Sequence, residues 1–346
     1  MSHHPAHAGD HRTPPAIPAI PEIMRAVTRQ AYGGVEQVQV QSVARPEPGV
    51  GQVLLAVRAA GLDRGVLHLL TGTPYLARPA FGLRRPRQPV LGREVAGQVV
   101  ALGPGVTGLA VGDRVFGAGE GTFAEYAAAR AERLAPIPDG VTDEQAATLP
   151  VSAGTALLAV RTHARVEAGQ RVLVLGASGA VGSFVVQVAA HLGAEVTGVC
   201  SAGKADFVRG LGAARVADYR TTSLGELPGP FDAIIDIAGN RPLAALRDVL
   251  TPAGALVIVG GEKGGPWFGG LHRNIGASLL NPLVSQRLGW FVSIETTELF
   301  TQLADLVATG AMRPALDRTV GLDGAADALA DMAAGRLQGK VVVRPA

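Results

Sequence analysis

The stretch Val172-Leu-Val-Leu-Gly176-Ala-Ser178-Gly179-Ala-Val-Gly182 decides the fold of this chain. An apolar, β-branched run enters a turn with glycines at positions 176, 179 and 182, and an apolar pattern of helical period follows it. A strand, a glycine-rich turn and a helix in this order are typical of the opening unit of a dinucleotide-binding fold. There the first glycine permits a tight bend, the second lets backbone approach a pyrophosphate, and the third lets helix and strand pack closely. Amides and the dipole at the helix N-terminus then hold the phosphate charge.

Two other interpretations of this stretch are an ordinary turn between a strand and a helix, and a transmembrane span. The sequence from Val172 to Ala194 contains no Asp, Glu, Lys or Arg. Glycines interrupt the run, however, and its period changes from strand to helix midway, so we reject a membrane span. The context favours dinucleotide binding over a purely structural turn. The residues expected to contact the cofactor here are Gly176, Ser178, Gly179, Ala180, Val181 and Gly182.

The whole chain sets wider limits on the class of protein. Its 346 residues suffice for two domains and a large core. Apolar residues make up 47 % and charged residues 17 %, as in soluble α/β enzymes. A net charge of +2 gives no basic field for nucleic acid, so we expect no nucleic-acid partner and no membrane partner. Cys200 is the only cysteine, which excludes an internal disulfide and a cysteine-based metal cluster and fits a cytoplasmic location.

Residues 1–23 differ in composition from the rest. They contain four histidines and five prolines, and no apolar core of a secretory signal. A metal-binding tract is one interpretation, and a disordered tail, which we favour, is the other. We expect the folded chain to begin near Met24.

The remaining sequence divides into two parts that differ in their pattern of expected strands and helices. Short strands broken by Gly and Pro run up to about residue 150, for example Gln52–Arg58, Gly97–Leu102 and Arg114–Gly117, and predict a small β barrel or sandwich. Strands and helices then alternate, which predicts a parallel, doubly wound sheet. Its expected strands are Arg171–Leu175, Glu195–Cys200, Arg215–Tyr219, Phe231–Ile237 and Ala255–Val259, with helices starting near Ala156, Ala180, Lys204 and Pro242. The stretch from Gly264 to Trp290 interrupts the alternation, and a helix over Thr297–Thr309 and a last segment ending at Val343 follow.

The end of the second expected strand bears on the choice of cofactor. NAD-specific folds place an Asp or Glu there, about 20 residues beyond the glycines, to bind the ribose 2′-hydroxyl. Here the strand ends in Cys200 and Ser201, and Lys204 follows. A hydroxyl and an ammonium suit a 2′-phosphate, and Tyr219 after the third strand offers another donor. Each residue also has a structural alternative: Ser201 as a helix N-cap, Lys204 as a solvated side chain and Tyr219 as a packing residue. Together, and with the acid missing, they predict NADPH.

The ordered set of motifs resembles the medium-chain dehydrogenase/reductase superfamily, and most of all its zinc-independent, quinone-oxidoreductase-like branch. The motifs are Ala60-Gly-Leu-Asp63-Arg-Gly, Leu91-Gly-Arg-Glu-Val-Ala-Gly97, Val111-Gly-Asp-Arg-Val-Phe-Gly117, Phe123-Ala-Glu-Tyr126, the glycine turn and Gly339-Lys-Val-Val. The resemblance implies a Rossmann-type sheet over 153–290, a GroES-like, β-rich catalytic domain over 24–152, and a C-terminal return over 291–346 that completes it. It also implies an active site between the domains and a homodimer.

Zinc-dependent members of this superfamily carry a Cys near the position of Asp63, a Gly-His-Glu motif, and a later Cys or Asp. This chain has Asp63, then Gly92-Arg93-Glu94, then Leu149-Pro-Val-Ser152. Arg93 puts a permanent cation in place of a histidine ligand. We therefore expect no metal, and without a Lewis acid the chemistry shifts toward reduction of an acceptor that is already polarised.

The predicted reaction is hydride transfer from C4 of NADPH to a small molecule, either a quinone or the β-carbon of an α,β-unsaturated carbonyl compound. Negative charge then develops on the carbonyl oxygen, which needs a donor in a dry cleft. Candidate catalytic residues are Asp63, His68 and Tyr75. By resemblance Asp63 lies beside the nicotinamide, where it contacts either the cofactor amide or the substrate. The structural alternatives are a turn residue for Asp63, a helix-face residue for His68 and packing for Tyr75.

Further cofactor contacts are expected where parallel strands end. Thr155 is placed near the nicotinamide by resemblance, with a helix N-cap as the alternative. Gly260 and Gly261 follow the fifth strand, and Asn240 ends the fourth. Trp267, Phe268 and Trp290 form either an aromatic wall for a flat substrate or packing in a dimer interface.

Three other functions stay open at this point. The first is reduction of a polyketide-type intermediate, which no residue separates from reduction of quinones or simple enones. The second is a metal-free carbonyl reductase or alcohol dehydrogenase. The third is a protein that binds NADPH without chemistry. A panel of quinones, enones and aldehydes, tested with NADPH and NADH, distinguishes them.

Overall fold

The computed structural model describes residues 20–239, 241–261 and 265–345. Most of the predicted N-terminal tail, with its histidines, and the candidate residue Asn240 lie outside these ranges. The first strand, β1, begins at Ile23, one residue before the expected start at Met24.

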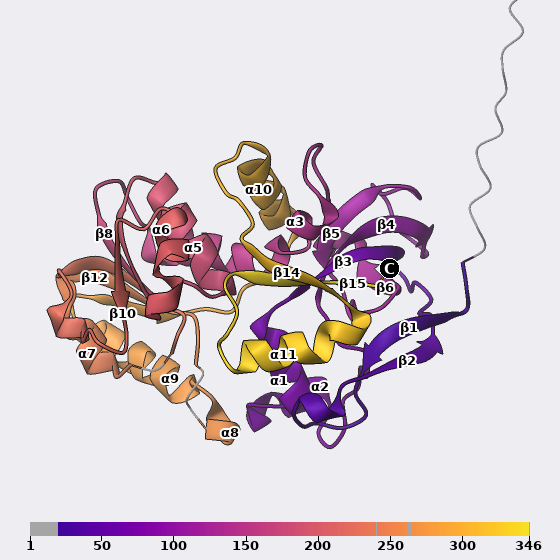
Figure 1. The fold of residues 1–346 in the computed structure, drawn as a ribbon, viewed down its shortest axis with the longest axis horizontal. Coiled ribbons are helices and arrows are strands. Elements are labelled where there is room, and N and C mark those ends of the chain that lie inside the picture. The colour runs from indigo at the N-terminus through magenta and orange to yellow at the C-terminus, as the bar shows by residue number, and fades with distance from the viewer. Residues whose placement is uncertain (1–19, 240, 262–264, 346) are drawn as a thin grey trace, which may run out of the picture.

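The N-terminal part is built from strands (Figure 1). β1 (Ile23–Thr28) and β2 (Gln39–Ala44) form an antiparallel ribbon. A seven-stranded sheet has the order β14-β15-β3-β4-β5-β7, and β6 pairs with β3 beside this path. The strands from this part are β3 (Gln52–Leu62), β4 (Glu94–Leu102), β5 (Arg114–Ala118), β6 (Tyr126–Arg130) and β7 (Leu134–Pro136). Between β3 and β4 lie α1 (Arg64–Thr71), η2 (Tyr75–Ala77) and α2 (Arg78–Phe81), and α3 (Asp143–Ala146) follows β7.

The C-terminal segment returns to this sheet. β15 (Lys340–Arg344) pairs antiparallel with β3, and β14 (Leu316–Gly321) pairs parallel with β15. Figure 1 shows the yellow strands and α11 (Ala325–Ala333) lying against the purple N-terminal elements. The last strand of the chain thus lies inside the sheet, between β14 and β3, and α10 (Thr297–Ala308) precedes the return. The boundaries at 152 and 290 remain our proposed division into domains.

The middle of the chain forms a six-stranded, fully parallel sheet in the order β10-β9-β8-β11-β12-β13. In chain order this is 3-2-1-4-5-6, the order of dinucleotide-binding sheets. The structure confirms the predicted fold class. The strands are β8 (Arg171–Leu175), β9 (Glu195–Cys200), β10 (Arg215–Asp218), β11 (Phe231–Asp236), β12 (Leu250–Ile258) and β13 (Arg287–Trp290). The helices are α4 (Gly154–Leu157), α5 (Ala180–His191), α6 (Ala205–Gly210), α7 (Leu243–Asp248), α8 (Gly265–Phe268) and α9 (Leu271–Leu280).

Burial on both faces of this sheet explains the continuous apolar run of β8. Val172 and Val174 enter one core cluster, with Phe184 from α5, while Leu173 and Leu175 enter another cluster on the opposite face. Successive side chains of a strand point to opposite faces, so a strand covered on both sides needs apolar residues at every position. No helix in the described ranges is long and apolar enough to cross a membrane.

Two predictions about elements were wrong. The stretch from Gly264 to Trp290 was expected to interrupt the sheet, but its end forms the sixth parallel strand, β13. This strand is short and lacks a β-branched run, so periodicity alone does not reveal it. The helix expected near Ala156, with Thr155 at its start, already begins at Leu149 as the π-helix η4 (Leu149–Ala153) and continues through α4 and η5 (Leu158–Ala164). Pro150 lies in its first turn, where a missing N–H is tolerated.

Candidate active site between the domains

A cavity of about 500 Å³ lies where the two parts of the chain meet. The N-terminal part, the helical segment around Ser152, the carboxyl ends of the parallel strands and the C-terminal return all contribute to its wall. Ser178 O accepts a hydrogen bond from Gly339 N at 2.9 Å, which ties the return to the glycine turn. The lining includes Asp63, His68, Ser152, Thr155, Gly176, Ser178, Gly179, Ala180, Val181, Lys204, Gly260, Gly261, Leu337 and Gly339.

The glycine turn has the geometry that the spacing predicts. Gly176 adopts a left-handed φ of +88°, which favours glycine. A Cβ on Gly182 would lie 2.1 Å from Gly176 O, so only glycine allows α5 to pack this closely against the turn. A Cβ on Gly179 would meet nothing closer than Gly176 O at 3.5 Å, so the backbone here is open toward the cleft. Gly179 is also the N-cap of α5, whose first amides therefore face a space that suits an anion.

A smaller cavity of about 230 Å³ adjoins the first at the end of β9. It brings together Cys200, Ser201, Lys204 and Tyr219, which the sequence predicted as neighbours of the adenosine end of the cofactor. Sequence reasoning missed Arg241, a second cation in this lining, although an Arg just after the fourth strand was a readable signal. Burial, with a contribution from Asp218, raises the pKa of the Cys200 thiol. Ser201 precedes a short 3-10 helix but forms no side-chain cap.

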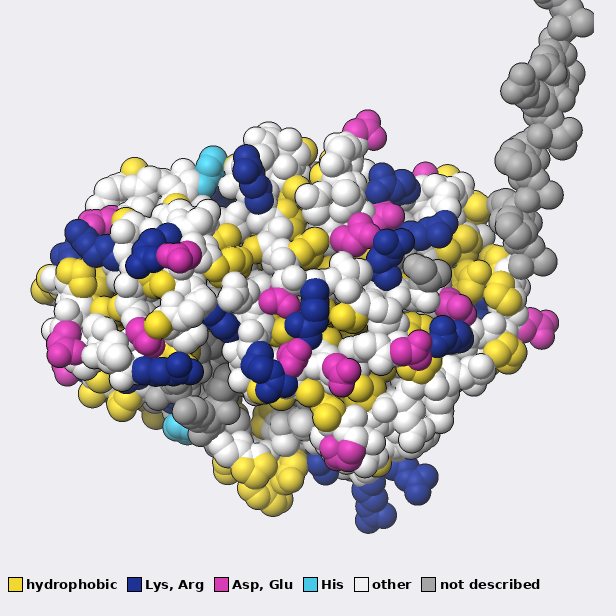
Figure 2. Space-filling model, viewed as in Figure 1, with side chains coloured by type: hydrophobic (Ala, Val, Ile, Leu, Met, Phe, Trp, Pro, Cys, Tyr) yellow, Lys and Arg dark blue, Asp and Glu magenta, His cyan; other side chains and the backbone are white. Residues whose placement is uncertain are grey.

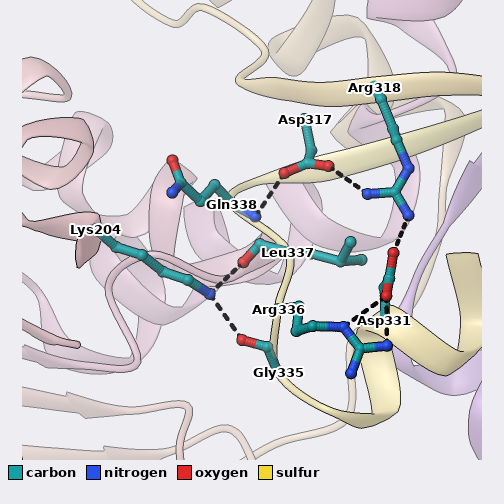
Figure 3. A network of polar contacts seen from close by, with 8 residues as sticks. All are labelled: Lys204, Asp317, Arg318, Asp331, Gly335, Arg336, Leu337 and Gln338. Carbon is teal, nitrogen blue, oxygen red and sulfur yellow. Dashed lines mark hydrogen bonds and ion pairs between the residues drawn. The ribbon is translucent and has the colours of Figure 1, made fainter. Parts of the chain in front are cut away.

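The Lys204 ammonium forms the bridge drawn in Figure 3. Its Nζ donates to Gly335 O at 2.8 Å and to Leu337 O at 2.6 Å, both in the loop between α11 and β15. Burial lowers the pKa of Lys204. The sequence placed Lys204 at the cofactor and did not predict this contact with the C-terminal return. The side chain lines both cavities while it holds the loop.

Asp63 lies at the N-terminus of α1 and is almost fully buried. Its Oδ1 accepts a 2.6 Å hydrogen bond from Gly65 N and so caps the helix, as the turn interpretation expected. Its Oδ2 is buried without a hydrogen-bond partner in the structure. A buried acceptor without a donor is costly. Asp63 is also among the residues that line the cleft.

A buried ion pair lies beneath this wall. Lys340 Nζ contacts Glu94 Oε2, and neither side chain has exposed surface. Lys340 Nζ also donates to Ser152 Oγ at 3.1 Å, and Val151 N donates to Glu94 Oε1 at 2.9 Å. Burial raises the pKa of Glu94 to about 7, although Lys340 opposes the shift, and Asp63 adds to it. Sequence reasoning did not select Ser152 or Lys340 as functional residues.

The other two catalytic candidates lie further out. His68 is exposed on α1 and lines the rim of the cleft. Tyr75 is absent from the described lining, and its ring instead packs edge-on against Trp267 of α8, with the centroids 5.2 Å apart. The guanidinium of Arg78 lies 4.3 Å from the centroid of the same ring. The structure therefore favours the packing interpretation of Tyr75, while its catalytic role stays a prediction.

The glycines after β12 line the cleft, but packing is sufficient to explain them. A Cβ on Gly260 would lie 1.9 Å from Ile237 O, and one on Gly261 would lie 2.6 Å from Gly270 Cα. The expected aromatic wall does not form as one surface, because the described lining contains neither Trp267 nor Phe268 nor Trp290. Trp290 ends the edge strand β13, and its Nε1 donates to Ser278 Oγ of α9.

By the resemblance to zinc-dependent dehydrogenases, Arg93 was expected at the position of a histidine ligand. Its NH2 donates to Glu295 Oε1 at 2.8 Å, and Arg133 lies 3.9 Å from the other oxygen of that carboxylate. Arg93 is therefore neutralised by a buried carboxylate from the segment before α10. In the part of the chain that the structure describes, no group of three or more His, Cys, Asp or Glu is placed to hold a metal ion.

Two known protein families match parts of this chain. The alcohol dehydrogenase GroES-like domain matches residues 49–139, and the zinc-binding dehydrogenase family matches residues 211–343. The chain is 42 % identical to polyketide synthase GfsB of Streptomyces halstedii over 214 residues. It covers only 4 % and 6 % of the length of the first polyketide synthases it matches.

Other relatives match over nearly the whole chain. The 2-methylene-furan-3-one reductase of Solanum lycopersicum is 30 % identical over 94 % of this chain and 80 % of its own length. The chloroplast envelope quinone oxidoreductase homolog of Arabidopsis thaliana is also 30 % identical, over 94 % of this chain and 99 % of its own. Among solved structures, mycobacterial Rv1454c complexed with NADPH has a TM-score of 0.80 and 28 % identity, covering 93 % of this chain and 100 % of its own.

Proposed function

Because the chain belongs to the quinone-oxidoreductase-like branch of the medium-chain dehydrogenase/reductase superfamily, a superfamily of oxidoreductases, we propose that it is an NADPH-dependent, metal-free reductase of activated double bonds or quinones. One observation carries the proposal. The open glycine turn shares a single cavity with two buried polar residues, Asp63 and Ser152. The glycine turn would hold the nucleotide, and the part of the cavity lined by Asp63 and Ser152 would take a small acceptor.

The residues present fit a nicotinamide dinucleotide. The bend at Gly176, the open backbone at Gly179 and the first amides of α5 would hold the pyrophosphate. The unpartnered Oδ2 of Asp63 would accept a hydrogen bond from the carboxamide. Thr155 lines the same cleft. Bound in this way, the cofactor supplies a hydride.

The adenosine end of the site supports the phosphorylated cofactor. Lys204 and Arg241 put two cations in the smaller cavity, and Ser201 stands where NAD-specific folds carry an acid. Tyr219 adds a phenol that is exposed at the edge of this cavity. A 2′-phosphate gains from cations and hydroxyl donors together, whereas an acid would repel it.

The chain's own residues would orient the acceptor and shield it from water. The cleft closes on one side with the C-terminal return, through Leu337 and Gly339, and on the other with the helical segment around Ser152. Arg93 and Lys340 are each neutralised by a buried carboxylate. The hydroxyls of Ser152 and Thr155 in the lining would then polarise an acceptor that is already electrophilic. The name of the tomato relative, a 2-methylene-furan-3-one reductase, supports an enone acceptor.

The test follows oxidation of NADPH and of NADH separately with benzoquinone, an enone, an enoyl thioester and an aldehyde. We expect saturable turnover with quinone or enone and a clear preference for NADPH. Faster turnover of aldehydes would make the protein a carbonyl reductase. Quenching of NADPH fluorescence with no turnover of any acceptor would make it a non-catalytic binding protein.

We also propose a homodimer that acts in the cytoplasm. β13 is an edge strand of the six-stranded sheet, and exposed apolar side chains lie along it and next to it. They are Leu279, Leu283, Trp290, Val292 and Ile294. An open edge with this much apolar surface suits pairing with a second copy. Light scattering after size-exclusion chromatography tests it, and a Leu283→Asp variant should shift the protein toward the monomer.

A further inference from the structure

The floor of the cleft contains an arrangement of buried polar groups that the proposed hydride transfer does not yet use. Lys340 of β15, Glu94 of β4 and Ser152 of η4 come from three separate segments and meet through Lys340 Nζ. A buried ion pair is weak evidence for stability, because apolar side chains of similar volume often serve as well. Its position under the cleft therefore calls for a chemical reason.

The direction of the hydrogen bonds leaves one proton available to the cleft. An ammonium group only donates, so Ser152 Oγ must accept from Lys340 Nζ, at 3.1 Å. The Ser152 hydroxyl then keeps its own proton to donate. Within residues 20–239, 241–261 and 265–345 we find no acceptor for that proton, and Ser152 lines the cavity. This proton is thus available to a molecule in the cleft.

We propose that Ser152 is a catalytic residue of the reductase, whose hydroxyl donates its proton to the carbonyl oxygen of the acceptor, and that Lys340 is the positioning residue that replaces this proton. The inference rests on the proposed function and names the donor that it lacks. Tyr75 lies outside the lining of the cleft and His68 lies at its exposed rim. Thr155 and Ser178 also line the cleft, but Ser152 is the lining hydroxyl that accepts a hydrogen bond from the Lys340 ammonium.

The step balances in atoms and charge. When hydride adds to the β-carbon of an enone, the electron pair of the C=C bond moves toward the carbonyl, whose oxygen becomes an enolate oxygen. This oxygen forms a bond to the Ser152 proton while the O–H bond of Ser152 breaks. Lys340 Nζ passes one proton to Ser152 Oγ and is left as a neutral amine. The product leaves as the enol. Lys340 then regains a proton from water in the cleft through the Ser152 hydroxyl, which gives its proton to Nζ and takes another from that water.

Glu94 keeps Lys340 in place for this role. Its Oε1 accepts from Val151 N at 2.9 Å and from Ser152 N at 3.4 Å, so the same carboxylate fixes both the lysine and the backbone that carries the serine. The groups that face Glu94 are Lys340, Asp63 and these two amides. A Cβ on Gly61 would lie 2.4 Å from Glu94 Oε2, so the pocket around the pair is closely packed.

The first experiment compares Ser152→Ala with Thr148→Val. Thr148 is an equally buried hydroxyl one turn earlier, but its Oγ1 donates to Gln145 O and it does not line the cleft. We expect Ser152→Ala to lower kcat about a hundredfold, the usual effect of removing one oxyanion donor, with little change in KM or in the affinity for NADPH. Thr148→Val should retain wild-type kcat, and thermal unfolding checks that both variants are folded.

A second readout does not need turnover. 4-Nitrophenol absorbs differently when ionised, so absorbance titration with cofactor-free protein reports whether the cleft stabilises an oxyanion. Wild type and Thr148→Val should bind the phenolate and lower the apparent pKa of the bound phenol, and Ser152→Ala should lose most of this effect. Equal titrations for wild type and Ser152→Ala, or no phenolate binding by wild type, would overturn the inference. Failure of the proposed function appears separately, as a wild type that binds phenolate but reduces no acceptor.

Lys340→Arg separates proton supply from charge. An arginine keeps the positive charge and the hydrogen bond but does not give up a proton. If Lys340 returns a proton to Ser152, the Lys340→Arg variant should have a reduced kcat but should largely retain phenolate binding. Full kcat in a folded Lys340→Arg variant would show that Lys340 acts only through its charge and would remove it from the proton step.

Discussion

Lys204 Nζ donates a 2.6 Å hydrogen bond to Leu337 O and thereby joins the nucleotide-binding sheet to the loop that leads into the last strand. The loop is itself fixed from its other side, because Asp317 Oδ1 accepts from Gln338 N and Asp331 pairs with Arg336 (Figure 3). The lysine therefore combines a contact with the cofactor cavity and a contact between domains. Both cavities include it in their lining.

Substitution of Lys204 should distinguish these two contacts. If the ammonium also binds the 2′-phosphate, Lys204→Met will raise the Kd for NADPH about tenfold to a hundredfold, since hydrogen bonds to charged groups contribute about 1.5–3 kcal/mol. The Kd for NADH should change much less. Fluorescence titration with both cofactors measures this, and Arg209→Met, an exposed cation paired with Asp206, is the control. An equal loss for NADPH and NADH would mean that Lys204 only holds the loop.

Gly182, the third glycine of the turn, should not tolerate a larger residue. Gly182→Ala would place a methyl group 2.1 Å from Gly176 O, so α5 must move away from β8. We expect a loss of about 1–3 kcal/mol in unfolding free energy, as for other overpacked sites, and weaker NADPH binding. Urea unfolding measures the first effect. Gly210→Ala is the matched control, because nothing lies within 4 Å of its Cβ, and it should leave stability unchanged or slightly higher.

How much of this was readable from the sequence depended on how local each feature is. The turn from Gly176 to Gly182 was predictable because its strand, glycines and helix are contiguous, and the alternation of β8 to β12 followed from periodicity. β13 was not predicted, because its pairing with β12 is set by the sheet and not by its own four residues. The net charge was a fair guide to the surface, where Figure 2 shows acidic and basic side chains interspersed over one face.

The site was predictable where it follows strand ends and unpredictable where distant segments meet. Cys200, Ser201 and Tyr219 line one cavity, as strand order implies. Lys340 reaches Glu94 and Ser152 only because the last strand returns to β3, a pairing across most of the chain that no local pattern encodes. Tyr75 was an understandable candidate, since a phenol near the expected cleft suits an enolate, but its ring packs against Trp267.

A second buried ion pair supports the nucleotide sheet. Asp236, at the end of β11, pairs with Arg273 of α9, and its Oδ1 accepts from Gly239 N. Asp236→Ala would leave Arg273 as an uncompensated buried cation, with Nε and NH1 already lacking partners. We expect a loss of about 3–5 kcal/mol in unfolding free energy. Asp206→Ala, which breaks the exposed pair with Arg209, should cost less than about 1 kcal/mol in the same urea titration. Similar losses in both variants would contradict a structural role for the buried pair.

The pH dependence of stability should carry the signature of Glu94. Burial raises the pKa of this carboxyl from 4.5 to about 7 in the folded state, despite Lys340. Between these two values the folded protein binds more protons than the unfolded chain, so the unfolding free energy falls as pH rises through this window. The shift corresponds to about 3 kcal/mol, lost by wild type between about pH 4.5 and pH 7. Glu94→Gln cannot ionise and does not undergo this loss. The difference in unfolding free energy, variant minus wild type, should therefore rise by about 3 kcal/mol between pH 5 and pH 8 in urea titrations. The other titrating groups are common to both proteins except Lys340, which loses its partner in Glu94→Gln. Parallel curves across that range would show that Glu94 is ionised throughout it, with Lys340 outweighing burial.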